Sequence, residues 1–227
     1  MSTDTRSLDC AVPPADLATT LPMPNARPRL VMLDRDGVIN ADSAAYVKSV
    51  AEWQPLPGAI AAIARLCEAG VQVTVCTNQS GVGRGLFALT ELQAIHDALH
   101  RSLAGFGARL SLLSYCPHAP DAGCACRKPA PGMLRSQLDL LAIDARDACF
   151  IGDSRRDLEA AAAAGVTPLL VRTGNGEALA TALRAGTAEL TAAAHPRACY
   201  ASLAEACQAL VSLPPPSRLS EARPQTC

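Results

Sequence analysis

The chain has 227 residues, of which 49% are hydrophobic and 3% aromatic, and its formal net charge at pH 7 is −1. This length suits one domain with tails and a largely aliphatic core, while the near-neutral charge and the lack of a basic block disfavour a nucleic-acid partner. No apolar run reaches the roughly 18 residues of a membrane span, and the N-terminus lacks the pattern of a secretion signal. We therefore expect a cytoplasmic protein with no membrane partner.

Residues 1–28 contain five prolines and little hydrophobic periodicity, which predicts a flexible N-terminal extension. A single domain is expected over 29–211, and the composition of 212–227 predicts a disordered tail. Within the domain, short apolar runs that predict strands alternate with amphipathic segments that predict helices. This alternation indicates an α/β fold with a parallel sheet between helices.

The elements follow in chain order. Strands are predicted over 30–34, 71–77, 108–116, 147–151, 166–173 and 198–200. Helices are predicted over 59–69, from a cap at Thr90 to about 104, and over 131–141, 154–164, 177–194 and 201–211. The glycine-rich stretch 81–85 is predicted to be a loop.

Polar residues stand at the C-terminal ends of three predicted strands. Asp34 and Asp36 follow the first strand, Thr77 and Asn78 the second, and Asp153 the fourth. Parallel strands bring these ends to one edge of the sheet, where open α/β sheets bind ligands. Carboxylates about 4 Å apart repel by about 4 kcal/mol at an effective dielectric constant of ~20, so such a cluster requires a cation, a proton or strong donors.

Two basic residues, Arg127 and Lys128, add fixed positive charge to this set. An isolated DxDG would be read more simply as an Asp-rich loop after a strand. Here, however, the converging strand ends combine acids that can bind a metal with a hydroxyl group and a fixed cation. This combination suits phosphoryl transfer, in which the protein mainly positions groups and offsets charge.

A second cluster lies just before Arg127, with three cysteines and one histidine within eleven residues. Four such ligands predict a closed structural zinc site, against the alternative of a chance cluster in a chain with ten cysteines. Zinc binding worth ~10–16 kcal/mol exceeds what a short polar loop gains from packing, so the metal would fix the backbone before Lys128. The predicted ligands are Cys116, His118, Cys124 and Cys126. No role is assigned to Cys10, Cys199, Cys207 and Cys227.

The ordered set LDRDGVIN, TNQSG, CRKP and IGDSRRD resembles the haloacid dehalogenase-type phosphatases over about residues 29–175. The resemblance implies a Rossmann-like three-layer α/β fold with a zinc-stapled loop, and no large cap insertion separates the motifs. It also implies a Mg²⁺-dependent phosphatase that works through an aspartyl-phosphate intermediate.

The resemblance assigns roles to individual residues. Asp34 would be the nucleophile, Asp36 the general acid and base, and Thr77 and Lys128 would hold the phosphoryl oxygens. Mg²⁺ would bind the Asp34 carboxylate, the Asp36 backbone carbonyl and Asp153. Asp157 matches the last acid of the fourth motif, although a helix acid favoured by the helix dipole explains it equally well.

DRDGVIN combined with the zinc loop is similar to one branch of this family, the heptose 1,7-bisphosphate 7-phosphatases of lipopolysaccharide core biosynthesis. Histidinol-phosphate phosphatases share the zinc loop, so they and phosphatases of other small phosphomonoesters are alternatives, and a non-catalytic zinc-stapled binding protein is a distant one. By this resemblance Arg127 could clamp a second, retained phosphate. The implied contacts to a small sugar phosphate are Asp42, Tyr46, Asn78, Gln79, Ser80, Arg127 and Ser154. A monomer is expected.

One further motif has a simple interpretation. His96 and His100 imitate the HExxH pattern of metalloproteases, but Asp97 replaces the required glutamate. We therefore predict ordinary helix-surface residues here.

Overall fold

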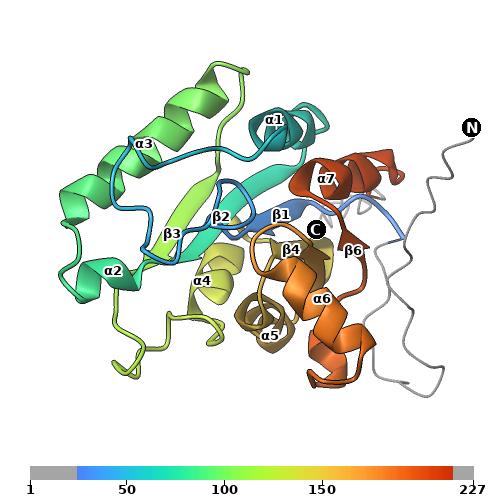
Figure 1. Ribbon diagram of the computed structural model, residues 1–227. Helices are drawn as coiled ribbons and strands as arrows, with labels where there is room; N and C mark the ends of the chain where they lie inside the picture. The colour runs from blue at the N-terminus through green and yellow to red at the C-terminus, as the bar shows by residue number, and fades with distance from the viewer. Residues whose placement is uncertain (1–24, 217–227) are drawn as a thin grey trace, which may run out of the picture.

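The computed structural model describes residues 25–216, which form a six-stranded parallel sheet between two layers of helices (Figure 1). The strands are β1 (Leu30–Leu33), β2 (Gln72–Asn78), β3 (Leu112–Cys116), β4 (Ala148–Gly152), β5 (Thr167–Val171) and β6 (Cys199–Tyr200). The helices are α1 (Ala59–Glu68), α2 (Ser80–Gly83), α3 (Leu89–Ala104), α4 (Gly132–Leu141), α5 (Arg155–Ala164), α6 (Gly176–Arg184) and α7 (Leu203–Ser212). The predicted α/β class is confirmed.

In the strand order β3-β2-β1-β4-β5-β6, the direction in which successive strands are added to the sheet reverses beside β1. From β1 the chain builds outward to β3, then returns to place β4 on the other side of β1, where Leu33 pairs with Ile151. Open α/β sheets bind ligands at such a switch point, beyond the carboxyl ends of the strands. Asp34 follows β1 and Asp153 follows β4, so both stand at the switch point.

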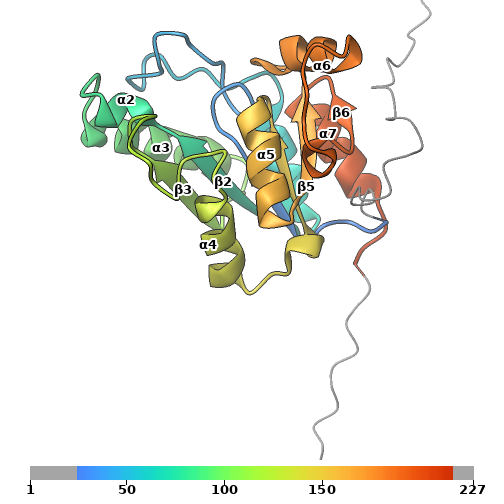
Figure 2. The ribbon, with the colours of Figure 1, turned by 90° about the horizontal axis from the view of Figure 1, so that it is seen from below.

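Alternate residues of the central strands enter two different cores. In β1, Val31 and Leu33 face the core formed with α1, α3 and α7, whereas Leu30 and Met32 face the core formed with α4 and α5. All four are fully buried, which explains the uninterrupted apolar run of a strand covered on both faces. Figure 2 shows α4 and α5 together on one side of the sheet.

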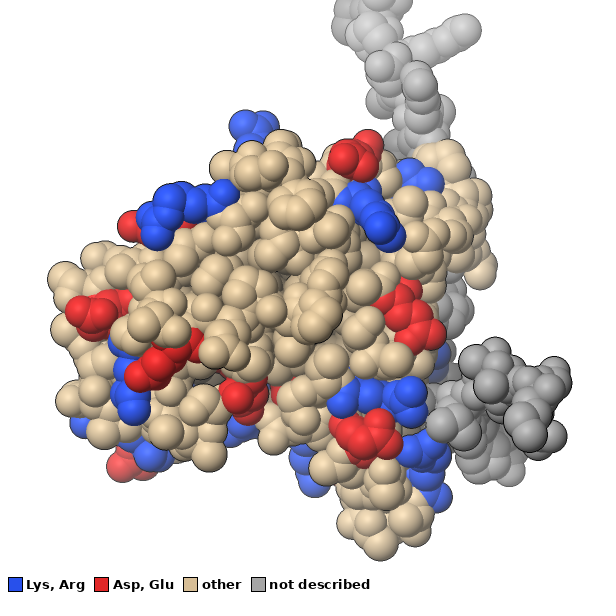
Figure 3. Space-filling model, turned by 45° about the horizontal axis from the view of Figure 1, so that its top comes forward, with Lys and Arg blue, Asp and Glu red and all other residues tan. Residues whose placement is uncertain are grey.

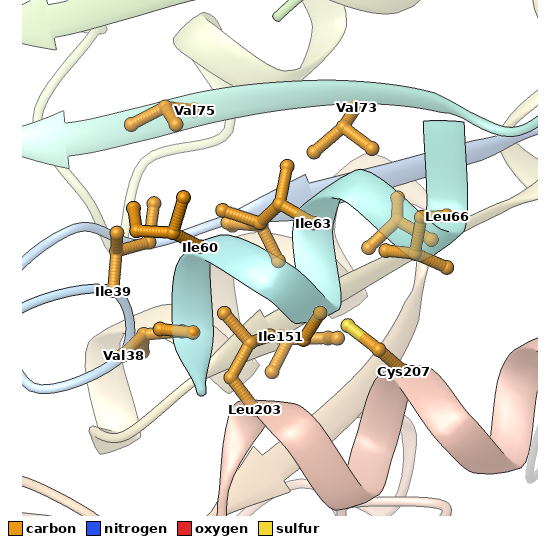
Figure 4. Close-up of a cluster of buried hydrophobic side chains, with 14 of the residues drawn as sticks. Val38, Ile39, Ile60, Ile63, Leu66, Val73, Val75, Ile151, Leu203 and Cys207 are labelled. Carbon is orange, nitrogen blue, oxygen red and sulfur yellow. The ribbon is translucent and has the colours of Figure 1, made fainter. Parts of the chain in front are cut away.

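The core beneath α1 and α7 joins distant parts of the chain (Figure 4). Ile63 of α1 lies there among side chains that include Val73 of β2 and Leu203 of α7. Cys207, for which the sequence indicated no role, is buried in the same core. Cys10 and Cys227 lie outside the described residues.

Two predicted boundaries were wrong near the second strand's end. Ser80–Gly83 form the short helix α2, not a loop, because the N–H of Arg84 donates back to the carbonyl of Ser80 at 3.0 Å. Helix α3 begins at Leu89, so Thr90 is not its cap. The carbonyl of Ala88 accepts the first N–H groups of that helix instead.

Two predicted elements are also too long. The third strand covers only Leu112–Cys116, since β2 pairs with those residues alone. Helix α6 ends at Arg184 and not at 194, because Gly186 adopts a φ of +66° that an α-helix cannot continue.

The packed domain reaches slightly beyond the predicted limits of 29 and 211. The guanidinium of Arg27 donates hydrogen bonds to the carbonyls of Ala69, Val211 and Leu213, at 3.1, 2.7 and 3.3 Å. It thereby satisfies carbonyl groups near the C-terminal ends of α1 and α7, which have no partner within their own helices. The rest of the predicted extension and tail, 1–24 and 217–227, lies outside the described residues.

The surface over the upper helices of Figure 1 carries interspersed acidic and basic side chains (Figure 3). No block of one sign stands out on the part of this face that the structure describes. None of the helices between residues 25 and 216 combines the length and apolar character needed to cross a membrane.

Candidate active site

Asp34 and Lys128 form the central ion pair at the switch point. The backbone N–H of Asp34 donates to the carbonyl of Ile151 at 3.0 Å, which fixes the residue to the end of β4. Its carboxylate lies 2.9 Å from Nζ of Lys128, and the same nitrogen lies 2.6 Å from Oδ1 of Asp157. The lysine side chain is 1% exposed, so one buried ammonium connects the acids that follow β1 and β4.

Asp157 acts both as a helix acid and as a site residue, so its two interpretations do not compete. It lies in the first turn of α5 and forms a capping box with Ser154, whose backbone N–H and hydroxyl donate to Oδ2 at 3.0 and 2.6 Å. Burial raises the pKa of Asp157, but Lys128 and the hydrogen bonds from Ser154 outweigh burial and hold that pKa below its ordinary value.

Asp153 is held by two glycines and one asparagine. Its Oδ2 accepts hydrogen bonds from the backbone N–H and the side-chain amide of Asn175, at 2.7 and 3.1 Å. A Cβ added at Gly37 or Gly174 would lie 2.2 or 2.1 Å from this oxygen, and both glycines have positive φ, +81° and +57°. Glycine is therefore required at both positions by backbone conformation and by space. Sequence reasoning missed Asn175.

The carboxylates of Asp34, Asp153 and Asp157 offer oxygen atoms that all lie within 4.8 Å of one another. If all three are ionised, three negative charges face the single positive charge of Lys128. Burial raises the pKa of Asp34 to about 8 and that of Asp153 to about 6, and neighbouring carboxylates act in the same direction. A divalent cation would neutralise the excess charge, and carboxylate oxygens are the ligands that Mg²⁺ prefers.

Asp36 faces a different set of partners. Its carboxylate is bound by the guanidinium of Arg35 and by the side-chain amides of Asn40 and Gln79, the last two at 2.8 Å each. Its carboxylate is thus not a member of the acidic cluster. Sequence reasoning assigned no role to Arg35 and Asn40, although both stand in the motif LDRDGVIN, because the motif does not reveal their partners.

Residues at the end of β2 hold neighbouring parts of the site together. The amide nitrogen of Gln79 donates to Oδ2 of Asp36 at 2.8 Å and to Oγ1 of Thr77 at 2.9 Å. The amide of Asn78 pairs with the backbone of Lys128 through two hydrogen bonds of 3.0 Å. Asn78 and Gln79 therefore position the lysine and Asp36, and their contact with a substrate stays a prediction.

A cavity of about 260 Å³ lies over these groups. All residues predicted for catalysis, magnesium binding or substrate binding line it: Asp34, Asp36, Asp42, Tyr46, Thr77, Asn78, Gln79, Ser80, Arg127, Lys128, Asp153 and Ser154. Two arginines that sequence reasoning missed, Arg84 and Arg156, line it as well. The tertiary structure thus gathers four separated motifs around one cavity.

The four predicted zinc ligands converge in the loop after β3. Sγ of Cys126 lies 3.4 Å from Sγ of Cys116 and of Cys124, and 3.3 Å from Nδ1 of His118. These separations are far longer than a disulfide bond of about 2.05 Å. They approach the edges of about 3.8 Å of a tetrahedron with zinc–sulfur bonds of ~2.3 Å. The donor atoms therefore fit one tetrahedral metal ion.

The predicted surface position was wrong for His96 and correct for His100. His96 is buried, with Nε2 lying 3.3 Å from a terminal nitrogen of Arg35 and its ring centroid 5.6 Å from that of Tyr115. The reason is that this face of α3 covers the sheet, whereas His100 and Asp97 point away from it and are exposed.

Comparison with known proteins gives a consistent result. The sequence profile of haloacid dehalogenase-like hydrolases matches residues 16–165. A D-glycero-beta-D-manno-heptose-1,7-bisphosphate 7-phosphatase from Pseudomonas putida is 52% identical over 149 residues, which are 66% of this chain and 85% of that protein. The enzyme of the same name from Bordetella bronchiseptica is 54% identical over 148 residues, or 65% of this chain and 83% of that protein.

Solved structures agree with the sequence comparison. The crystal structure of the D,D-heptose 1,7-bisphosphate phosphatase from B. bronchiseptica, complexed with magnesium and phosphate, superposes with a TM-score of 0.74. It is 46% identical, and the match covers 81% of this chain and 98% of that one. The corresponding phosphatase from Burkholderia thailandensis has a TM-score of 0.60 and 38% identity, over 81% of this chain and 99% of its own.

Replacing Gly174 tests the packing around Asp153. In Gly174→Ala, the new Cβ would collide with Oδ2 of Asp153 in a backbone conformation that already disfavours alanine. We expect a loss of about 2–4 kcal/mol in the free energy of unfolding, from left-handed strain and overpacking together. Urea denaturation measures it.

Gly186→Ala is the matched control, since Gly186 has a φ of +66° but nothing within 4 Å of an added Cβ. This variant should lose only the ~1–2 kcal/mol of backbone strain. Equal losses in the two variants would contradict a steric role for Gly174.

Proposed function

Because the chain belongs to the haloacid dehalogenase-like hydrolases, we propose that it is a Mg²⁺-dependent phosphatase that removes the 7-phosphate of D-glycero-D-manno-heptose 1,7-bisphosphate. This reaction would serve the synthesis of nucleotide-activated heptose for the lipopolysaccharide core. The observation that carries the proposal is the cavity at which Asp34, Lys128 and the acidic cluster meet. Relatives more than 50% identical bear the name of this activity.

The nucleophile in this proposal is Asp34. Its carboxylate attacks phosphorus and the bond to O7 of the sugar breaks, which leaves an aspartyl-phosphate. Lys128, fixed beside Asp34, and the hydroxyl of Thr77 stabilise the negative charge on the phosphoryl oxygens. When bound by Asp34, Asp153 and the Asp36 carbonyl, Mg²⁺ would supply further positive charge to those oxygens.

Proton transfer falls to Asp36. As a carboxylic acid it gives its proton to O7 while the phosphorus–oxygen bond breaks. The resulting carboxylate then takes a proton from the water that hydrolyses the aspartyl-phosphate, and inorganic phosphate leaves. One residue can serve both steps because the second restores the proton that the first consumed.

Three guanidinium groups favour a substrate with two phosphates. Arg84 directly follows α2, Arg127 belongs to the zinc loop and Arg156 to α5, and all three line the cavity. Nη1 of Arg127 is buried and has no hydrogen-bond partner among the described residues, so it is available to an anion. Guanidinium groups bind phosphate with two parallel hydrogen bonds. A bisphosphate uses this positive charge more fully than histidinol phosphate would.

We propose that residues 42–46, which follow the motif LDRDGVIN, contact the sugar. Asp42 accepts a hydrogen bond from the side chain of Asn175 at 3.1 Å, so this loop is tied to the residue that holds Asp153. Tyr46 adopts a φ of +65°, an uncommon conformation for a residue other than glycine. Strained residues of this kind are often found where a ligand binds.

The remaining features complete the proposal. Zn²⁺ bound by the loop after β3 would be structural, because four protein ligands leave no open position. We place the enzyme in the cytoplasm, where sugar phosphates are made, and propose that it acts as a monomer on a small soluble substrate.

Steady-state kinetics with Mg²⁺ test this function directly. We expect a higher kcat/KM on the heptose 1,7-bisphosphate, assayed as both anomers, than on histidinol phosphate. Asp34→Asn should lower turnover by at least about 10⁴-fold, since the nucleophile is lost while the side-chain volume is kept.

Asp139→Asn, the same change on the exposed face of α4, is the matched control and should keep full activity. A strong preference for histidinol phosphate would reject the proposed substrate. Undiminished turnover by Asp34→Asn would reject the assignment of the nucleophile.

Metal analysis tests the zinc loop. The purified protein should contain about one zinc per chain, and the double change Cys124→Ser and Cys126→Ser should remove it. Activity should fall as well, because the loop presents Arg127 and Lys128. Cys67→Ser, outside the loop, should retain the metal. A fully active wild-type protein without zinc would contradict this role.

A further inference from the structure

The carboxylate of Asp36 is held by five hydrogen bonds. Oδ1 accepts from Nε of Arg35 at 3.0 Å, from Nη2 of Arg35 at 2.9 Å and from the amide of Asn40 at 2.8 Å. Oδ2 accepts from Nη2 of Arg35 at 2.9 Å and from the amide of Gln79 at 2.8 Å. Arg35 supplies three of these contacts, so its guanidinium decides the plane and direction of the carboxylate.

Arg35 is in turn held by His96. The arginine side chain is fully buried, and its Nη1 lies 3.3 Å from Nε2 of His96. A guanidinium can only donate, so Nε2 must offer its lone pair and the proton of a neutral imidazole must sit on Nδ1. Burial and the charge of Arg35 lower the pKa of His96 to about 3, which keeps the ring neutral.

The histidine ring has a fixed position of its own. It lies on α3 and packs against Tyr115 of β3, with ring centroids 5.6 Å apart and planes tilted by 50°. A chain of contacts therefore runs from the edge of the sheet through His96 and Arg35 to Asp36. His96 and Tyr115 are far from the DxD motif in the sequence, although they support it in the structure.

Stability alone does not explain this arrangement. Burying an arginine and its carboxylate partner costs desolvation energy, and apolar residues of similar volume are often as stable. The buried chain ends at a carboxylate whose side chain is 22% exposed and lines the cavity. The arrangement thus presents one oriented carboxylate to the place where a substrate would bind.

We propose that Arg35 and His96 are positioning residues that hold Asp36 for its two proton transfers, an inference that rests on the proposed function. In the first transfer Asp36 gives its proton to the leaving oxygen as the phosphorus–oxygen bond breaks. In the second, the carboxylate takes a proton from water as that water attacks the aspartyl-phosphate. Both need the oxygen of Asp36 to stand at a defined place, which the rigid guanidinium fork secures.

Two substrates with different leaving groups can distinguish a positioning role of Arg35 and His96 from a purely structural one. The sugar alkoxide is a poor leaving group and requires a proton from Asp36, whereas p-nitrophenolate leaves without one. Attack by Asp34 on p-nitrophenyl phosphate should therefore not depend on the placement of Asp36. Hydrolysis of the aspartyl-phosphate depends on it with either substrate.

The variants are His96→Leu, which removes the acceptor of Arg35, His96→Gln, which keeps an acceptor, and Arg35→Lys, which keeps the charge but loses the fork. His100→Leu is the matched control, an exposed histidine one turn further along α3. Circular dichroism and zinc content report whether each variant is folded. Arg35→Lys carries the test if His96→Leu does not fold.

We expect His96→Leu and Arg35→Lys to lower kcat on the heptose bisphosphate by about tenfold or more, with KM changed less than about twofold. On p-nitrophenyl phosphate they should keep a rapid burst of p-nitrophenolate in the first turnover, followed by a slow steady state. His96→Gln should regain most of the lost kcat, and His100→Leu should match the wild type.

The inference is overturned if the burst and the steady state fall by the same factor, or if kcat of both variants stays near the wild-type value. A wild-type protein that hydrolyses neither substrate would instead reject the proposed function, before any variant is compared.

Discussion

The burial of one ammonium group between two carboxylates is the interaction on which the rest of the structure depends. Lys128 is 1% exposed and lies within 2.9 Å of both Asp34 and Asp157. A buried charge is stable only when its partners are held in place, so each element around it must be positioned accurately. Asn78 clamps the backbone of the lysine, and the ring of Phe150 lies 5.2 Å from its Nζ. The loop after β3, whose three cysteines and one histidine have the geometry of a metal site, carries the lysine to this point.

A second buried cation, Arg35, separates the surroundings of the two acids that follow β1. Asp34 and Asp36 are two residues apart, yet Asp34 faces Lys128 and Asp36 faces Arg35. Each acid thus has its own counter-ion and its own surroundings, which agrees with the two different roles proposed for them. The excess negative charge stays with Asp34, Asp153 and Asp157, where a divalent cation would neutralise it. The Lys128–Asp34 pair and the Arg35–Asp36 pair thus lie side by side as two separate ion pairs.

Glycine makes the close approach of these systems feasible. Gly37 and Gly174 both lie against the carboxylate of Asp153, and neither position has space for a Cβ. The loops after β1 and β5 can therefore meet over the acid that follows β4. Asn175 continues this contact by donating to Asp153 and to Asp42, so the segment proposed to contact the sugar is connected to the acidic cluster.

The sequence by itself determined the α/β class and the polar strand ends, because each of these rests on local spacing, and the expected parallel sheet then predicted that the motifs meet at one edge. A short stretch of sequence is enough to recognise a buried strand followed by two acids, or three cysteines and a histidine within eleven residues. Only the tertiary structure decided which residues support them. His96 was predicted on the surface because helical periodicity does not reveal which neighbour covers a face, and its contact with Arg35 spans 61 residues. Arg84 and Arg156 lie within or beside motifs that the sequence shows, but only the packing of distant elements reveals that they and Asn175 line the cavity.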